Sequence, residues 1–255
     1  FVDVEPGTFN VDVDALESMV GPDTRAMLVP NLIGNAPDWD RLRGVADRHG
    51  LLVVEDSCDA LGARLRGTPT GTRSDLSVTS FAASHIITAA GNGGMVLLDD
   101  EARRDRGLLL RRWGRSSEVQ FYGSRKGDKR FLAEVDGMDY DSLFVFEELG
   151  WNFEPSELGA AFGLEQLKKL PHNLEVRQRN FARYQEFFAG LPEVFEPPVQ
   201  LDGLDTAWLA YPFVIRPESG IERAAFQRAL EARGIDTRMV RTGNVLRQPM
   251  MRNVP

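Results

Sequence analysis

Three polar residues of this chain have types and positions suited to chemistry on a ligand: Asp56, Ser80 and His85. Asp56 closely follows the apolar run 51–54, and the ends of buried parallel strands are where α/β proteins place ligand-binding groups. Ser80 lies at the end of a second apolar run, where its hydroxyl can donate to a phosphate oxygen. The imidazole of His85 can act as a base near neutral pH. These residues predict a site that holds a ligand and moves a proton.

Each of these residues also has a structural interpretation. Asp56 could cap the following helix, and Ser80 could be satisfied by nearby backbone groups. His85 stands in an apolar stretch, where a lone histidine is usually structural. The choice between the interpretations depends on the wider motifs around these residues.

The elements that must position these residues follow from the apolar pattern. Helical spacing is found at 11–20 and at 38–49, where Asp38 is the expected N-cap. A helix between two short apolar runs predicts a parallel βαβ unit. The expected strands are 26–29, 51–54, 77–81 and 95–98. A glycine-rich turn, Gly91-Asn92-Gly93-Gly94, separates the last two.

The second half of the chain has a different pattern. We expect a helix at 100–113, a long irregular polar loop at 114–148, and a strongly periodic helix at 155–188 that is broken near Pro171. Beyond it we expect a strand at 210–215, a helix at 221–233 and a strand at 236–239. The predicted domains are a large one at 1–191 and a small C-terminal α+β domain at 192–255.

Composition excludes several classes of protein. The net charge of −8 without a basic tract argues against a nucleic-acid partner. No apolar run approaches the roughly 20 residues that a membrane span needs, and no signal peptide opens the chain. The single Cys58 excludes an internal disulfide and a cysteine-only metal cluster, and it fits a reducing, cytoplasmic location. No metal site is expected.

Two motifs resemble the sugar aminotransferase family of fold-type I pyridoxal phosphate (PLP) enzymes. Glu55-Asp56 ends a strand, and Ser80-Phe81 precedes His85 at the spacing at which the family has its Schiff-base lysine. The resemblance implies an α/β fold: a large domain with a mixed, mostly parallel sheet, and a small C-terminal α+β domain. A histidine in place of the lysine is typical of the sugar 3-dehydratases, which use pyridoxamine phosphate (PMP).

The resemblance also implies roles for individual residues. Asp56 would pair with the protonated pyridine nitrogen, and Ser80 would contact the cofactor phosphate. Asp59, where ordinary sugar aminotransferases usually have glutamine, would also lie at the cofactor. His85 would remove a proton from the cofactor C4′ and cannot form the covalent link of a lysine. Asn152, in a Gly-x-Asn segment, would reach the cofactor phosphate of the partner subunit in a homodimer.

A third motif is rarer outside the 3-dehydratases. Gly243-Asn244-Val245-Leu246-Arg247-Gln248-Pro249 matches their Gly-Asn-x-x-Arg-Gln-Pro segment, so Asn244 and Arg247 would bind the sugar or its diphosphate. An exposed surface role for Arg247 is the alternative. One branch of the subgroup carries a [2Fe–2S] cluster, which needs four thiolates, and one cysteine cannot build it.

The sequence therefore leaves three hypotheses. The first is a PMP-dependent 3-dehydratase of a nucleotide-linked 4-keto-6-deoxyhexose, with an amino donor such as glutamate regenerating PMP. The second is an aminotransferase whose lysine was replaced, and the third is a cofactor-binding relative without turnover. Three residues separate Thr88 from Asn92, one more than in the related dehydratases. Compared with the resembled family, we expect the sequence to lack segments at both ends.

Overall fold

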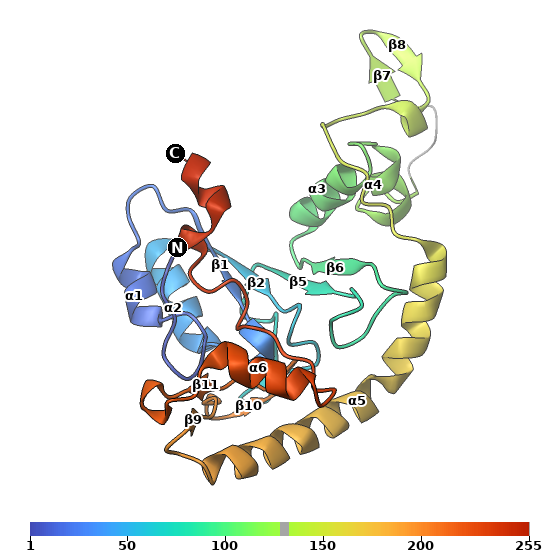
Figure 1. Ribbon diagram of the computed structural model, residues 1–255. Helices are drawn as coiled ribbons and strands as arrows, with labels where there is room; N and C mark the ends of the chain where they lie inside the picture. Colours follow the sequence, from blue (N-terminus) through green and yellow to red (C-terminus); the bar gives the residue numbers. More distant parts are fainter. Residues whose placement is uncertain (128–132, 255) are drawn as a thin grey trace.

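The centre of the molecule is a four-stranded sheet in the order β1-β2-β5-β6 (Figure 1). The computed structural model describes residues 1–127 and 133–254. β1 (Ala26–Pro30), β2 (Leu52–Asp56) and β5 (Leu76–Ser80) run parallel, whereas β6 (Gly94–Leu97) pairs with β5 in the antiparallel direction. The register sets Pro30 opposite Asp56, so both strands end at one edge. The predicted parallel βαβ unit is confirmed.

Two helices cover one face of this sheet, α1 (Val13–Ser18) and α2 (Trp39–His49). Asp38 caps α2 as predicted: its carboxylate accepts hydrogen bonds from the amides of Asp40 and Arg41. Gly50 ends the helix in the left-handed conformation, which glycine adopts without strain. The apolar stripe of α2 is completely buried and forms the core together with β1 and β2.

An arm projects from the sheet at residues 101–127 and 133–144 (Figure 1). It contains α3 (Glu101–Arg111), α4 (Ser117–Tyr122), the hairpin of β7 (Ala133–Val135) and β8 (Met138–Tyr140), and the short helix η2 (Ser142–Phe144). The prediction of an irregular loop at 114–148 was wrong for the described residues of this range, and its residues 128–132 lie outside the described part of the chain. Glu118 is fully buried in α4 and pairs with Arg111 and Arg112, so ion pairs hold α3 and α4 together.

The 33-residue helix α5 (Glu157–Ala189) curves from the base of the arm past the sheet (Figure 1). Ser156 caps it, and the prediction of a break near Pro171 was wrong, because the helix continues through that residue. Proline removes one backbone hydrogen bond and bends a helix, and a helix can continue beyond the bend. Within the part of the chain that the structure describes, no helix is both long and apolar enough to cross a bilayer.

The C-terminal part returns to the sheet through short elements. Its strands are β9 (Phe195–Glu196), β10 (Leu204–Asp205) and β11 (Val214–Ile215), followed by α6 (Arg223–Glu231). β10 joins the ribbon of β3 (Arg64–Leu65) and β4 (Thr68–Pro69), and β11 pairs with β9. Four short helices complete the chain, η1 (Leu32–Gly34), η3 (Pro217–Ser219), η4 (Val245–Arg247) and η5 (Pro249–Asn253).

Two of the predicted C-terminal strands differ from the structure. The strand expected at 210–215 is reduced to β11, and the described residues 236–239 form no strand. Aromatic contacts surround β11: the ring of Phe188 stacks on Tyr211 and Phe213 and meets Phe195 edge to face. The proposed domain boundary near residue 192 stays a prediction.

Candidate active site at the carboxyl ends of the strands

Asp56 and Ser80 are the last residues of the neighbouring strands β2 and β5. Both are partly buried, and each also makes one local hydrogen bond. The Cys58 amide donates to Asp56 Oδ1 at 3.0 Å, and the Ala82 amide donates to Ser80 Oγ at 3.2 Å. Asp56 is therefore oriented by the turn that follows its strand, and it caps no helix. Ligand-binding groups of α/β proteins lie at this edge of the sheet.

His85 lies in a closed loop between β5 and β6. The Ala89 amide donates to the Phe81 carbonyl at 2.9 Å, and the Phe81 amide donates to the Gly93 carbonyl at the same distance. Buried Ile86 and Ile87 anchor the loop next to the histidine. The imidazole Nδ1 is buried and has no hydrogen-bond partner among the described residues. A buried polar atom without a partner is costly, so this histidine is not a satisfied core residue.

Asp59 joins His85 to two other segments of the chain. Its Oδ1 lies 3.6 Å from His85 Nε2, and its Oδ2 accepts hydrogen bonds from the amide of Ile33 and from the guanidinium of Arg241. The Asp59 side chain is 9% exposed and that of His85 is 18% exposed. The predicted residues Asp59 and His85 are thus brought together, although they are far apart in sequence.

Arg241 is a member of this cluster that the sequence pattern missed. It comes from the C-terminal segment, three residues before Asn244, and has a positive φ of 48°. Arginine is common in this chain, and this one is distinguished by its contact with the buried Asp59 carboxylate, which also faces His85. The contact brings the segment that begins the Gly-Asn-x-x-Arg-Gln-Pro motif against the carboxyl edge of the sheet.

A second missed group is the buried network beneath Asp56. Glu55 is 1% exposed and accepts hydrogen bonds from Asn31 Nδ2 at 2.8 Å, Ser57 Oγ at 2.6 Å and the Gly71 amide at 2.8 Å. Trp39 Nε1 in turn donates to Asn31 Oδ1 at 2.7 Å. The two residues of the Glu-Asp pair therefore have different positions. Glu55 is buried and holds the end of β2 through its hydrogen bonds, and the side chain of Asp56 points to the opposite face of the sheet.

Cys58 lies between the two aspartates of this motif. Burial, with the neighbouring Asp56 and Asp59 carboxylates, raises the pKa of its thiol to about 12. Thiolate is the form that binds metals and reacts as a nucleophile, so this environment disfavours both roles. Among residues 1–127 and 133–254, no group of three or more histidine, cysteine or acidic side chains could hold a metal ion.

The other predicted site residues lie on the surface. Asn152 is exposed, and its Oδ1 accepts a hydrogen bond from the Glu154 amide at 3.3 Å. Asn244 caps the short helix η4 through the Leu246 amide, and Arg247 is exposed at the end of that helix. None of these three side chains has a hydrogen bond or ion pair to Asp56, Ser80 or His85 in the described chain. Their functional roles stay predictions.

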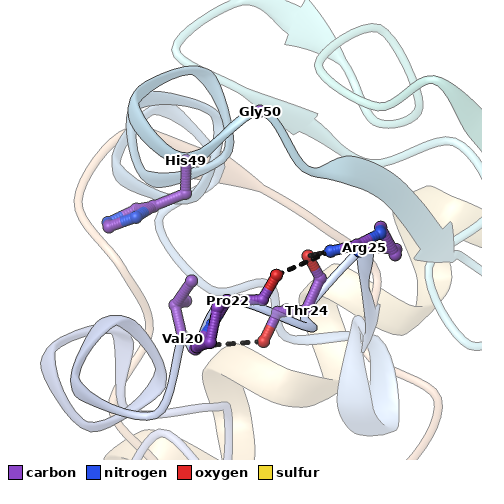
Figure 2. Close-up of a pocket in the computed structure, with 7 residues that line it drawn as sticks. Val20, Pro22, Thr24, Arg25, His49 and Gly50 are labelled. Atoms are coloured by element: carbon purple, nitrogen blue, oxygen red, sulfur yellow. Dashed lines mark hydrogen bonds between the residues drawn. The ribbon is translucent and has the colours of Figure 1, made fainter.

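The hollow shown in Figure 2 is at the other end of the strands. Val20, Pro22, Thr24, Arg25, His49 and Gly50 are among the residues that line it. Arg25 immediately precedes β1 and Gly50 lies two residues before β2, so this hollow is at the amino ends of the two parallel strands. It is therefore separate from the edge that carries Asp56 and Ser80.

The residues at the carboxyl edge fit a phosphorylated pyridine cofactor. A carboxylate at the end of β2 can pair with a pyridinium, and a hydroxyl and the glycine turn at the ends of β5 and β6 can approach a phosphate. His85 supplies the atom that still needs a partner. This fold and this set of residues define a PLP-dependent transferase fold of the α/β class.

Comparison with known proteins identifies the family. The pattern of the DegT/DnrJ/EryC1/StrS aminotransferase family matches residues 1–255, and the chain belongs to this family. Several solved relatives contain PLP or a derived intermediate, in accordance with a PLP-dependent family. The predicted family and fold class are confirmed.

Relatives with two different activities resemble the chain. A dTDP-4-dehydro-2,6-dideoxy-D-glucose 3-dehydratase of Saccharopolyspora spinosa is 36% identical, over 100% of this chain and 55% of the relative. The structure of an E. coli GDP-4-keto-6-deoxy-D-mannose-3-dehydratase with bound hydrated PLP is 29% identical, with a TM-score of 0.87, and covers 98% of this chain and 62% of the other.

A sugar aminotransferase from Micromonospora echinospora is 33% identical, with a TM-score of 0.76, and covers 94% of this chain and 60% of the other. The chain thus spans between half and two thirds of the length of these relatives. Similarity at this level shows a PLP-dependent enzyme family, and relatives named as 3-dehydratase and as sugar aminotransferase resemble the chain to a similar degree.

Proposed function

We propose that this chain is part of a PMP-dependent 3-dehydratase acting on a nucleotide-linked 4-keto-6-deoxyhexose. The observation that carries the proposal is His85: a histidine stands at the position of the family's Schiff-base lysine, next to buried Asp59, with an unpartnered ring nitrogen. The 36% identical 3-dehydratase supports the same reaction class. The chain has four lysines, and none lies between Asp56 and Gly94.

PMP, when bound, supplies a primary amine for condensation with the 4-keto group and a ring that accepts electrons. Asp56 would hold the proton on the ring nitrogen through charge pairing, and Ser80 would donate to the phosphate. Asp59 would keep the imidazole in position, as in a carboxylate–histidine pair. His85 would take the proton from the cofactor C4′, and loss of the C3 hydroxyl of the sugar would follow.

The nucleotide sugar would bind between this edge and the C-terminal segment. Arg241 already brings that segment to Asp59. Asn244 and Arg247 follow it closely, and both side chains are exposed, which suits contact with a sugar or a diphosphate. An amino donor such as glutamate would regenerate PMP. The proposed location is the cytoplasm.

A homodimer would complete the site. Asn152 is exposed and lies in a surface rich in apolar side chains, as expected for a residue that reaches a partner subunit. Large apolar patches on a surface are typical of protein interfaces. The exposed apolar residues near it in sequence are Phe144, Phe146, Leu149, Trp151, Phe153 and Leu158.

The second candidate is a sugar aminotransferase whose lysine was replaced, favoured by the 33% identical sugar aminotransferase. The decisive experiment incubates the complete protein with PMP and 4-keto-6-deoxyhexose nucleotides and follows the product by mass. Loss of the C3 oxygen supports the 3-dehydratase. Replacement of the keto oxygen by an amine without loss of the C3 hydroxyl supports the aminotransferase, and binding without turnover contradicts both.

Two variants test the cofactor assignments. Asp56→Asn should retain the fold and lose most of the turnover, because it removes the charge pairing with the pyridinium. An Asp56 that served only to accept the Cys58 amide hydrogen bond would leave turnover nearly normal. Borohydride reduction with PLP should attach no cofactor to the segment around His85, because it contains no lysine. A reduced adduct in this segment would contradict non-covalent binding.

A further inference from the structure

The loop that carries His85 rests directly on the first turn of α5. Gly159, in that turn, is buried. A Cβ atom at position 159 would lie only 3.0 Å from the carbonyl oxygen of Ala89. A contact of 3.0 Å is tighter than nine in ten Cβ contacts, so a side chain at this position fits only if the Ala89 carbonyl shifts by a few tenths of an ångström.

Ala89 is the residue that closes the His85 loop. Its amide donates to the Phe81 carbonyl at 2.9 Å, and its carbonyl accepts from the Asn92 amide at 3.4 Å. On another side lies Gly93, where an added Cβ would be 3.3 Å from the Cβ of Ala89. Ala89 is partly buried and therefore lies against both the glycine turn and α5.

A displacement of Ala89 is expected to reach His85. The loop between Phe81 and Ala89 is closed by a hydrogen bond, and buried Ile86 and Ile87 leave few alternative backbone paths. His85 Nε2 lies 3.6 Å from Asp59 Oδ1, so a small shift of the loop would change the distance between the imidazole and this carboxylate. Misplacement by about 1 Å can cost roughly a hundredfold in rate.

We propose that Gly159 is a positioning residue: by lacking a side chain it lets α5 set the position of Ala89, and through it the position of His85. The proposal rests on the proposed function in that His85 acts as the base. Through this contact, α5 packs directly against the loop that carries His85. The exposed segment with Asn152 immediately precedes α5 in the chain. The extra residue of the Thr88–Asn92 turn lies at this contact.

The chain contains its own control, Gly163, one turn further along α5. A Cβ at position 163 would lie 3.5 Å from the Cβ of Ala89, which is an ordinary contact distance. Both glycines have helical backbone, where alanine is favoured over glycine. Gly159→Ala and Gly163→Ala thus add the same atom to the same helix, and only the first pushes the carbonyl of Ala89.

The test compares these two variants with the unsubstituted protein. Gly159→Ala should shift the loop by a few tenths of an ångström and lower kcat about threefold to tenfold, with a smaller change in KM and no decrease in melting temperature. Its Phe81 and Ala89 amides should exchange with deuterium faster. Gly163→Ala should match the unsubstituted protein in all of these measurements. Equal behaviour of the two variants would overturn the proposal.

Ala89→Leu examines the same contact from the loop side. The larger side chain would meet Gly163 and Gly93, so it should also lower kcat and speed up exchange in the loop. If the unsubstituted protein has no turnover with any sugar, the proposed function fails. Amide exchange and PLP affinity, measured by fluorescence, then still decide the positioning role. Unchanged exchange in both Gly159→Ala and Ala89→Leu would refute it.

Discussion

The two halves of the molecule differ in how far their apolar side chains are exposed to solvent. In the half built from α1, α2 and the parallel strands, Leu42 is 0% exposed, and the core is closed within one chain. Around the arm and the first half of α5, Leu149 is 96% exposed and Leu158 is 83% exposed (Figure 1). The first half can be stabilised by its own packing, whereas the second presents a surface suited to another polypeptide.

The candidate site lies where these halves meet. Asp56 and Asp59 lie at the carboxyl end of β2, in the half with the closed core, and the His85 loop contacts both Asp59 and the first turn of α5. A site at such a junction can respond to the position of α5 while its carboxylates stay fixed. The comparison predicts different consequences for substitutions in the core, in the exposed half and at the junction.

The largest effect is expected at the junction itself. His85→Asn should lower turnover by about 10²–10⁴-fold, the usual contribution of a general base, and should leave the melting temperature and PMP affinity nearly unchanged. Solvent exchange of the C4′ proton, followed by NMR, should be lost in the same proportion. His172→Asn, on the exposed surface of α5, is the matched control. Exchange at the original rate in His85→Asn would locate the base elsewhere.

The next effect separates the core from the exposed half. Leu42→Ala should lower the free energy of unfolding by about 2–5 kcal/mol, because it leaves a cavity in a closed core. Leu158→Ala removes the same atoms from a surface position and should change subunit stability by only about 0.5 kcal/mol. Its effect should instead be on the proposed homodimer, which should dissociate more readily in sedimentation experiments. Equal losses in urea unfolding would contradict the distinction between the halves.

A smaller effect is expected at the start of α2. Asp38 caps the helix and pairs with Arg66 at 2.9 Å, so Asp38→Ala should cost about 0.5–2 kcal/mol at neutral pH. The hydrogen bond from Arg66 lowers the pKa of the Asp38 carboxyl. Its stabilisation is therefore complete above the ordinary pKa of an aspartate and is lost as the pH falls through the lowered value. The free energy of unfolding of Asp38→Ala should therefore fall less on acidification than that of the unsubstituted protein.

The control for this experiment is Asp47→Ala, which removes an exposed ion pair with Arg43 in the same helix. Exposed pairs of this kind contribute only a few tenths of a kcal/mol. Urea unfolding at several pH values measures both variants. A loss at Asp47 as large as that at Asp38 would show that charge, and not capping, determines the result.

The smallest effect is expected for the reactivity of Cys58, which lies partly buried just after β2. Since burial raises its pKa to about 12, the folded protein should react with iodoacetamide at pH 8 much more slowly than the urea-unfolded chain. The sign for stability follows from linkage: between the ordinary thiol pKa and 12 the unfolded state releases the proton more readily, so stability falls as the pH rises. Rapid labelling of the folded protein would contradict this environment.

The sequence alone determined the local elements of the core and the family. The N-cap Asp38, the parallel βαβ unit and the carboxyl-edge position of Asp56 and Ser80 followed from periodicity and from short-range signals, which act over one or two turns. The continuity of α5 through Pro171 and the absence of a strand at 236–239 were not predictable in this way. Packing of distant segments outweighs local preference at such places.

Only the tertiary structure decided how the site is assembled. Arg241 reaches Asp59 across most of the chain, and no spacing in the sequence distinguishes it from the other arginines. Likewise, the contact between Gly159 and Ala89 depends on where α5 passes the glycine turn. Long-range contacts are determined by how whole helices and strands pack against each other. The residue type at a single position therefore does not predict which distant residue it will contact.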